Sequence, residues 1–124
     1  MVYIPETANG RFDIDCLEKR LQEAKADEDN KDRLLIGCFS VGSNVTGVVT
    51  DDVAVTILMH KYGGLAFWDY AAAAAHVQIV MNPVVSSCES EGLARKDALY
   101  FSGHKLVGGP QTPGRFKETN HGYI

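Results

Sequence analysis

Three side chains that can act on a phosphate or a carbonyl group follow one apolar run, in the segment YFSGHKLVGG at residues 100–109. Ser102 and His104 supply a hydroxyl and an imidazole, which both suit phosphate oxygens. Lys105 supplies an amine, which becomes a nucleophile when it is partly desolvated and then forms a Schiff base with a carbonyl compound. Because the apolar run indicates a buried strand, we expect this set at the end of a strand, with Lys105 partly desolvated there.

A carboxylate stands in a similar place earlier in the chain, since Asp69 ends the apolar run LAFWD at residues 65–69. A carboxylate at a strand end can keep a ring nitrogen protonated. An amine, phosphate-binding groups and such a carboxylate are the protein groups that pyridoxal phosphate requires. Each residue alone also has a plainer interpretation, as a surface lysine, a turn histidine or a helix-capping aspartate. Their combination favours a cofactor site.

Two helices are predicted between these residues and the N-terminus. Apolar residues at helical spacing predict an amphipathic helix over residues 15–26, with Asp15 and Glu18 forming a capping box at its start. A second helix is expected to begin after Thr50 as its N-cap and to run to residue 62, where a pair of glycines follows. The alanine run that follows Asp69 is expected to form a loop or a short helix.

Strands are predicted from three apolar runs, at residues 34–40, 65–69 and 97–103, and the polar segment RFKET at residues 115–119 could add a fourth. Strands and helices alternate, and the connections between the strands are long enough for crossovers. This pattern is typical of an α/β fold with a mainly parallel sheet.

In a parallel sheet, ligands bind beyond the carboxyl ends of the strands. Polar residues follow three of the predicted strands, at residues 40–46, at Asp69 and at residues 102–105. We therefore expect all three polar groups to face one crevice.

Composition limits the class of protein. The chain has 124 residues and a net charge of −4, which indicates a single globular domain without the basic surface that binds nucleic acid or anionic membranes. No apolar run is long enough for a membrane span. Its three cysteines, Cys16, Cys38 and Cys88, show no metal-binding spacing, so we predict no metal site and free thiols in a reducing cytoplasm.

Three segments resemble the class V aminotransferases of the cysteine desulfurase type, which are fold-type I pyridoxal-phosphate enzymes. They are SNVTG at residues 43–47, HKYGGLAFWDYAAAA at 60–74 and YFSGHKLVGGPQTPG at 100–114. The resemblance covers nearly the whole chain. It implies a three-layer αβα fold in which residues 1–124 form one segment of the cofactor-binding large domain of a longer protein. It also implies an amino-acid substrate and a homodimeric parent.

The resemblance implies a role for each candidate residue. Lys105 matches the lysine that forms the Schiff base with the cofactor, and Asp69 matches the partner of the pyridine nitrogen. Ser102 and His104 match the phosphate contacts. Asn44 matches the asparagine near the phenolic oxygen of the cofactor.

The chain also departs from the family pattern. Desulfurases carry a glutamine three residues after the aspartate, where this chain has Ala72, and Gln111 lies in a loop that is often richer in glycine. His76 lies near a family histidine, but a packing or loop role is expected for it. The upstream phosphate-binding turn, the residue that stacks on the cofactor ring and the downstream small domain have no counterpart in this sequence.

Two interpretations of the function follow. In the first, the chain is a fragment of a pyridoxal-phosphate-dependent aminotransferase, desulfurase or lyase, and is inactive in isolation. In the alternative, it is a non-catalytic structural or interaction domain that keeps the fold. A nucleotide-binding domain of the Rossmann type is disfavoured because no GxGxxG motif follows a strand. Uncovered strand edges and apolar faces predict self-association or a partner chain.

Overall fold

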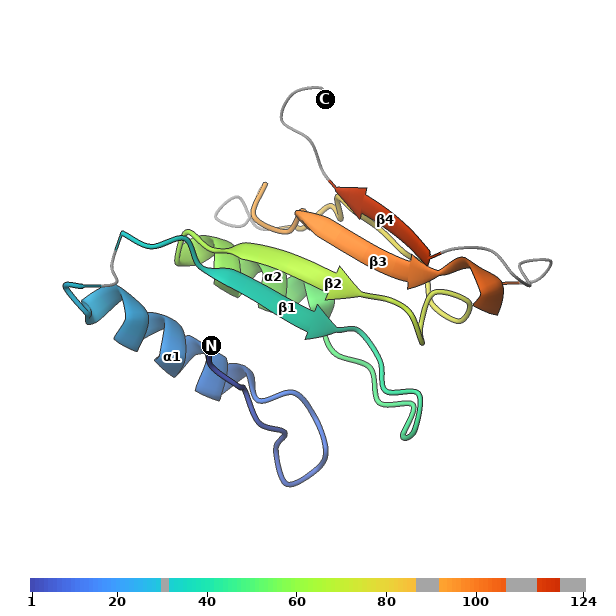
Figure 1. Cartoon of the computed structure of the whole chain (residues 1–124), viewed down its shortest axis with the longest axis horizontal. Coiled ribbons are helices and arrows are strands. Elements are labelled where there is room, and N and C mark those ends of the chain that lie inside the picture. The colour runs from blue at the N-terminus through green and yellow to red at the C-terminus, as the bar shows by residue number, and fades with distance from the viewer. Residues whose placement is uncertain (30–31, 87–91, 107–113, 119–124) are drawn as a thin grey trace.

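Four strands form one sheet in the order β1-β2-β3-β4. They are β1 (Ile36–Ser40), β2 (Leu65–Asp69), β3 (Ala98–Ser102) and β4 (Gly114–Glu118). The computed structural model describes residues 1–29, 32–86, 92–106 and 114–118. The first three strands are parallel and β4 pairs antiparallel with β3 (Figure 1). The predicted α/β class with a mainly parallel sheet is confirmed, and the polar segment near residue 115 does form a strand.

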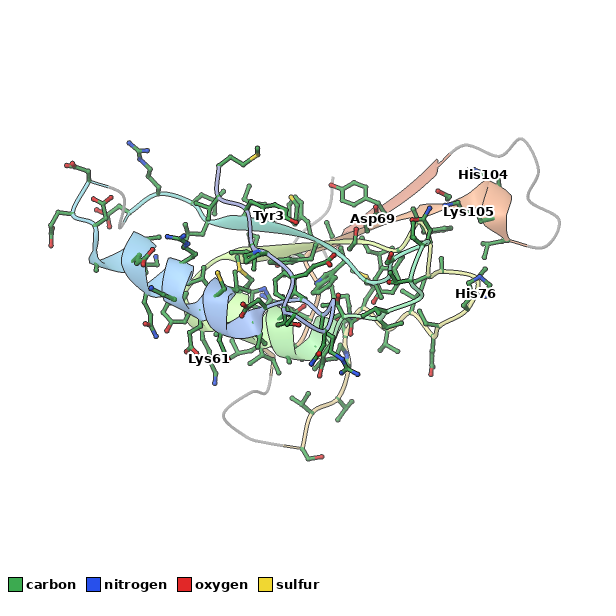
Figure 2. The ribbon with its side chains drawn as sticks, turned by 90° about the horizontal axis from the view of Figure 1, so that it is seen from below. Tyr3, Lys61, Asp69, His76, His104 and Lys105 are labelled. Atoms are coloured by element: carbon green, nitrogen blue, oxygen red, sulfur yellow. The ribbon has the colours of Figure 1, made fainter. Side chains whose placement is uncertain are left out.

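Two α-helices occur in the described residues, α1 (Ile14–Ala26) and α2 (Asp52–Lys61), and both lie on the same side of the sheet (Figure 2). The core lies between this side of the sheet and the helices. Trp68 of β2 is fully buried there, and its indole nitrogen donates to the Thr56 hydroxyl of α2 at 2.9 Å. Neither helix in this part of the chain is long and apolar enough to cross a membrane.

The helices begin one or two residues away from the predicted caps. Asp13 caps α1 by accepting from the Cys16 amide at 2.9 Å, and Asp51 caps α2 by accepting from the Ala54 amide at the same distance. The predicted caps Asp15 and Thr50 are therefore wrong. Several neighbouring polar residues near each predicted helix start can act as the N-cap. In both helices the cap is the residue whose side-chain oxygen accepts from the amide three residues ahead.

Strand boundaries and the turns after them agree with the predictions to within two residues. Strand β1 begins at Ile36, two residues later than expected, and α2 ends before Gly63, which has a φ of 70°. This left-handed conformation suits glycine and explains why the helix stops there. The alanine run at 71–75 forms hydrogen-bonded turns, with the Ala74 amide donating to the Tyr70 carbonyl at 2.8 Å.

The expectation that residues 34–40 form a fully buried strand is wrong for one face of β1. Phe39 packs against the helices and is buried, but Ile36 is 50% exposed and Cys38 and Ser40 are exposed too. The reason is positional, because β1 is an edge strand and the described helices cover only one face of the sheet. We call the other face, which carries Ile36, Cys38, Asp69, Tyr100 and Ser102, the open face.

Candidate functional site

Asp69 is the last residue of β2 and lies on the open face. Its neighbour Trp68 points to the helices, so alternation along the strand directs Asp69 the opposite way. One carboxylate oxygen, Oδ1, accepts from the Ala71 amide at 2.6 Å. The side chain is exposed. No described residue binds its second oxygen, so this atom can accept a proton-bearing group of a ligand.

Ser102 ends β3, the next strand of the sheet. The pairing of Asp69 with Tyr100 places Tyr100, and therefore Ser102 two residues on, on the same face as Asp69. Ser102 is half-buried and its side chain makes no capping bond to the turn that follows. The hydroxyl therefore lies at the end of the strand where a phosphate or another polar ligand group could bind it.

A short 3-10 helix, η2 (Gly103–Lys105), carries the other two residues of the motif. Figure 2 shows Asp69, His104 and Lys105 at the same end of the molecule, with His76 at this end too but on the helix side of the group. A carboxylate, a hydroxyl, an imidazole and an amine therefore gather at the carboxyl ends of two neighbouring parallel strands, as the sequence predicted for these residues.

The expected desolvation of Lys105 is not found in the described residues. Both His104 and Lys105 are exposed. The physical reason is that β3 ends at Ser102 and the turn of η2 carries the next side chains out into solvent. Any groups that exclude water from the Lys105 amine therefore have to come from outside the described part of the chain.

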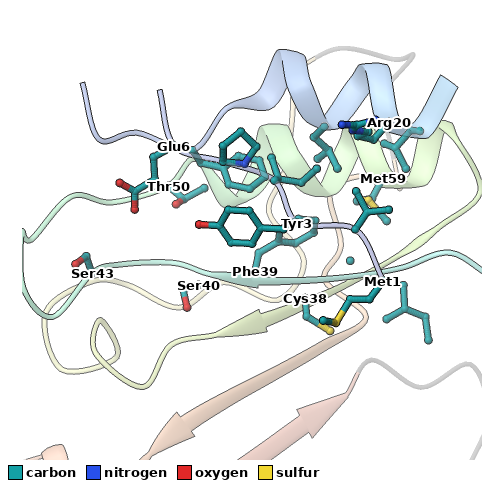
Figure 3. Close-up of a pocket in the computed structure, with 18 of the residues that line it drawn as sticks. Met1, Tyr3, Glu6, Arg20, Cys38, Phe39, Ser40, Ser43, Thr50 and Met59 are labelled. Carbon is teal, nitrogen blue, oxygen red and sulfur yellow. The ribbon is translucent and has the colours of Figure 1, made fainter. Parts of the chain in front are cut away.

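Asn44 lies in the loop after β1. It lines a cavity of about 830 Å³ between the N-terminal segment, α1 and β1, together with Ser40 and Ser43 (Figure 3). None of Asp69, Ser102, His104 and Lys105 lines this cavity. Ser40 pairs with Asp69 in the register of β1 and β2, so it lies beside Asp69 on the open face, whereas Ser43 and Asn44 belong to the loop that lines the cavity. The expectation that all three polar strand ends share one crevice stays a prediction. Cys88 and Gln111 lie outside the described residues.

A buried polar cluster beneath Asp69 was not predicted as a unit. The Tyr70 hydroxyl donates to the carboxylate of Asp52, and the Lys96 ammonium lies 3.0 Å from the same carboxylate oxygen. Lys96 also donates to the Val80 carbonyl at 2.9 Å, and its side chain is only 2% exposed. Burial, and secondarily the bond to Asp52, raises the pKa of Tyr70. No local sequence signal joins these residues, because Asp52, Tyr70 and Lys96 are far apart along the chain.

His60 of α2 and Asp97, the residue before β3, form a partly buried pair. The His60 ring bonds to the Leu93 carbonyl at 2.6 Å through Nδ1 and lies 2.8 Å from Asp97 through Nε2. The same Asp97 oxygen accepts from the Ala66 amide at 2.7 Å. These atoms are engaged with one another, so the pair stabilises the fold.

Comparison with known proteins gives a family and a fold. A sequence profile of the family described as Aminotransferase class-V matches residues 1–111. A NifS-like protein from Rickettsia africae ESF-5 has a similar structure, with a TM-score of 0.69 and 20% identity, over 93% of this chain and 28% of that one. Mouse CSAD in its apo form matches with a TM-score of 0.65 and 18% identity, over 91% of this chain and 22% of that one. No curated protein matches the chain.

These structural matches confirm the predicted αβα fold. At 20% identity or less, these matches show only that the fold is similar. The chain spans about a quarter of the length of either solved structure.

Proposed function

Because the chain belongs to the aminotransferase class-V family, we propose that it is part of a pyridoxal-phosphate-dependent enzyme that acts on an amino acid. The observation that carries the proposal is the placement of Asp69 and the Ser102–Lys105 motif at the ends of neighbouring parallel strands, with Asp69 and Ser102 on one face. Ligands of open parallel sheets bind in this position.

The described residues fit the cofactor in their donor set. Asp69 keeps one carboxylate oxygen without a described partner, and this oxygen would hold the ring nitrogen. The Ser102 hydroxyl and the His104 imidazole would bind phosphate, and the Lys105 amine would hold the aldehyde carbon. We assign Asn44 the weakest part in this site, because it lines the separate cavity beside β1.

Lys105 and Asp69 are the proposed catalytic residues. When bound, pyridoxal phosphate supplies an aldehyde and a protonated ring that draws electrons from the substrate's α-carbon. Asp69 would keep the proton on the ring nitrogen, since a nearby carboxylate favours the charged form. The Lys105 amine would also serve as the general base toward the substrate's α-proton.

Borohydride trapping tests the proposal. The chain is incubated with pyridoxal phosphate and reduced, and the modified peptide is located by mass spectrometry, with Lys105→Ala as the control. A dominant adduct on Lys105 that disappears in the variant supports a preorganised site. Labelling spread evenly over the surface lysines counts against it.

The alternative, a non-catalytic domain that retains the fold, is favoured by one observation. Ala72 stands in the turn after β2, where desulfurases have a glutamine, and its methyl group offers the cofactor no hydrogen bond. The same experiment on the Ala72→Gln variant separates the two interpretations. If neither the natural chain nor Ala72→Gln is labelled at Lys105, the alternative is preferred.

We also propose that the protein is a cytoplasmic homo-oligomer and that the isolated chain self-associates. Strand β1 is a sheet edge, and the open face exposes half of Ile36 and 42% of Tyr100. An unpaired strand edge and exposed apolar side chains favour association. Analytical ultracentrifugation of the chain and of Ile36→Lys tests this, and a natural chain that stays monomeric at high concentration would contradict it.

A further inference from the structure

Tyr70 is bound through each of its polar groups. It directly follows Asp69, and its amide donates to the Tyr100 carbonyl of β3 at 2.7 Å. Its carbonyl accepts from the Ala74 amide at 2.8 Å, and its hydroxyl donates to the Asp52 carboxylate. The side chain is 1% exposed. One residue thus joins the end of β2 to three separate segments of the fold.

The carboxylate of Asp52, which accepts from the Tyr70 hydroxyl, is itself held by other groups. It is the first residue of α2, where a negative charge is favoured by the helix dipole. The ammonium of Lys96 lies 3.0 Å from its carboxylate and is itself held by the Val80 carbonyl. A charge balanced in this way, with bonds to several fixed groups, has one favoured orientation. The Tyr70 hydroxyl is therefore anchored to a rigid point.

This anchor reaches Asp69 through the backbone. Oδ1 of Asp69 accepts from the Ala71 amide at 2.6 Å, and this is the bond that sets how the exposed carboxylate points. The Ala71 amide belongs to the peptide unit that follows Tyr70. Its position depends on where Tyr70 is held, because the side chain of Ala71 offers no polar anchor of its own.

We propose that Tyr70, Asp52 and Lys96 form a positioning cluster that holds the Asp69 carboxylate in the orientation needed to bind a ring nitrogen. Tyr70 and Lys96 act through Asp69 and do not touch the ligand. The identity of that ligand rests on the proposed function, but the orientation of Asp69 is a property of the chain alone.

The adjoining bond between Trp68 and Thr56 provides a matched control. It lies in the same buried layer, at 2.9 Å, and involves a hydroxyl as the Tyr70 bond does. The Thr56 hydroxyl also donates to the backbone carbonyl of Asp52 at 2.6 Å, so Thr56→Val removes a bond to the same helix residue but leaves the Asp52 carboxylate, Tyr70 and the Ala71 turn with their own bonds. Thr56→Val and Tyr70→Phe should both reduce stability, but only Tyr70→Phe should release Asp69.

The first test is amide hydrogen exchange of Ala71, measured by NMR on the full chain without cofactor. We expect exchange in Tyr70→Phe to be about tenfold faster than in the natural chain, as the loss of one bond to a charged group implies. Thr56→Val should leave the rate within about twofold. Equal rates in the natural chain and Tyr70→Phe, or equal acceleration in both variants, overturn the proposal. Should Tyr70→Phe not fold, Asp52→Asn tests the same anchor.

The second test uses pyridoxal phosphate as the probe. The concentration that gives half-maximal borohydride labelling of Lys105 should rise about tenfold in Tyr70→Phe and stay unchanged in Thr56→Val. An unlabelled natural chain with accelerated Ala71 exchange in Tyr70→Phe would reject the proposed function and support the positioning cluster. Normal labelling with unchanged Ala71 exchange would support the function and reject the cluster.

Discussion

Asp69 and Tyr70 are neighbours in the sequence and yet belong to two differently built regions. Tyr70 and its partners Asp52 and Lys96 form a buried polar cluster in which the side-chain groups have partners. Asp69 and Ser102 lie on the open face and Lys105 follows in η2, so that an oxygen, a hydroxyl and an amine remain available there. The difference indicates that satisfied polar groups stabilise this fold, while those left for a ligand contribute little to it.

The largest difference in stability between the two regions is expected when one lysine is replaced in each. Lys96→Met leaves the Asp52 carboxylate without its cation, and we expect the free energy of unfolding to fall by about 3 kcal/mol. The exposed Lys105→Met should change it by less than about 0.5 kcal/mol. Urea denaturation followed by Trp68 fluorescence measures both. Similar losses in the two variants would show that the regions do not differ in this way.

Substitutions of two aspartates, Asp97 in the partly buried pair and Asp69 on the open face, should also differ in their effect on stability. Asp97→Asn weakens the contacts to His60 and to the Ala66 amide, so we expect a loss of about 2 kcal/mol in the free energy of unfolding. Asp69→Asn keeps an acceptor for the Ala71 amide and should cost less than about 0.5 kcal/mol. Thermal unfolding of the two variants side by side provides the measurement. An Asp69→Asn loss as large as that of Asp97→Asn would contradict the distinction.

Alkaline pH acts on the buried region through Tyr70. Its pKa is raised by burial and by Asp52, so above about pH 10 the unfolded chain ionises this phenol while the folded chain keeps it neutral. Its contribution to stability is fully present below that pH and is lost as pH rises. The natural chain should lose up to about 1.4 kcal/mol more per pH unit than Tyr70→Phe.

The control for this pH dependence is Tyr100→Phe, which removes a phenol from the open face. Denaturant midpoints at several pH values between about 9 and 11 give the slopes. If Tyr70→Phe and Tyr100→Phe show the same slope, the buried environment of Tyr70 is not the cause.

The smallest expected effect compares two hydroxyl groups. Thr56→Val removes the bond from Trp68 and the bond to the Asp52 carbonyl, and should cost about 1 kcal/mol. Ser102→Ala on the open face should stay within about 0.5 kcal/mol but should reduce borohydride labelling of Lys105. Chemical denaturation and peptide mapping report the two effects separately. Undiminished labelling in Ser102→Ala would remove Ser102 from the proposed phosphate contacts.

The sequence predicts the elements because their signals are local. Apolar spacing indicated α1 and α2, and apolar runs that end in polar residues indicated the strands and the placement of Asp69 and Ser102 at their ends. Cap positions were missed by one or two residues because several neighbouring polar side chains compete for the same amides.

Long-range features were beyond this kind of prediction. Asp52 and Lys96 are far apart in the chain, and a lone lysine in a sequence is usually exposed, so nothing indicated their burial together. The cavity that Asn44 lines depends on which strand lies at the sheet's edge, and the sequence pattern does not specify that order.

The connection from β2 to β3 has a kinetic consequence. Strand β1, helix α2 and strand β2 follow one another closely, whereas β3 joins the sheet only after residues 70–97. The described residues of this connection form no α-helix to shorten it, whereas α2 shortens the connection from β1 to β2, so we expect the β1–α2–β2 unit to form early and β3 to dock late. Lys96, which binds Asp52 across this loop, would then contribute after the transition state, and its main effect would be to slow unfolding.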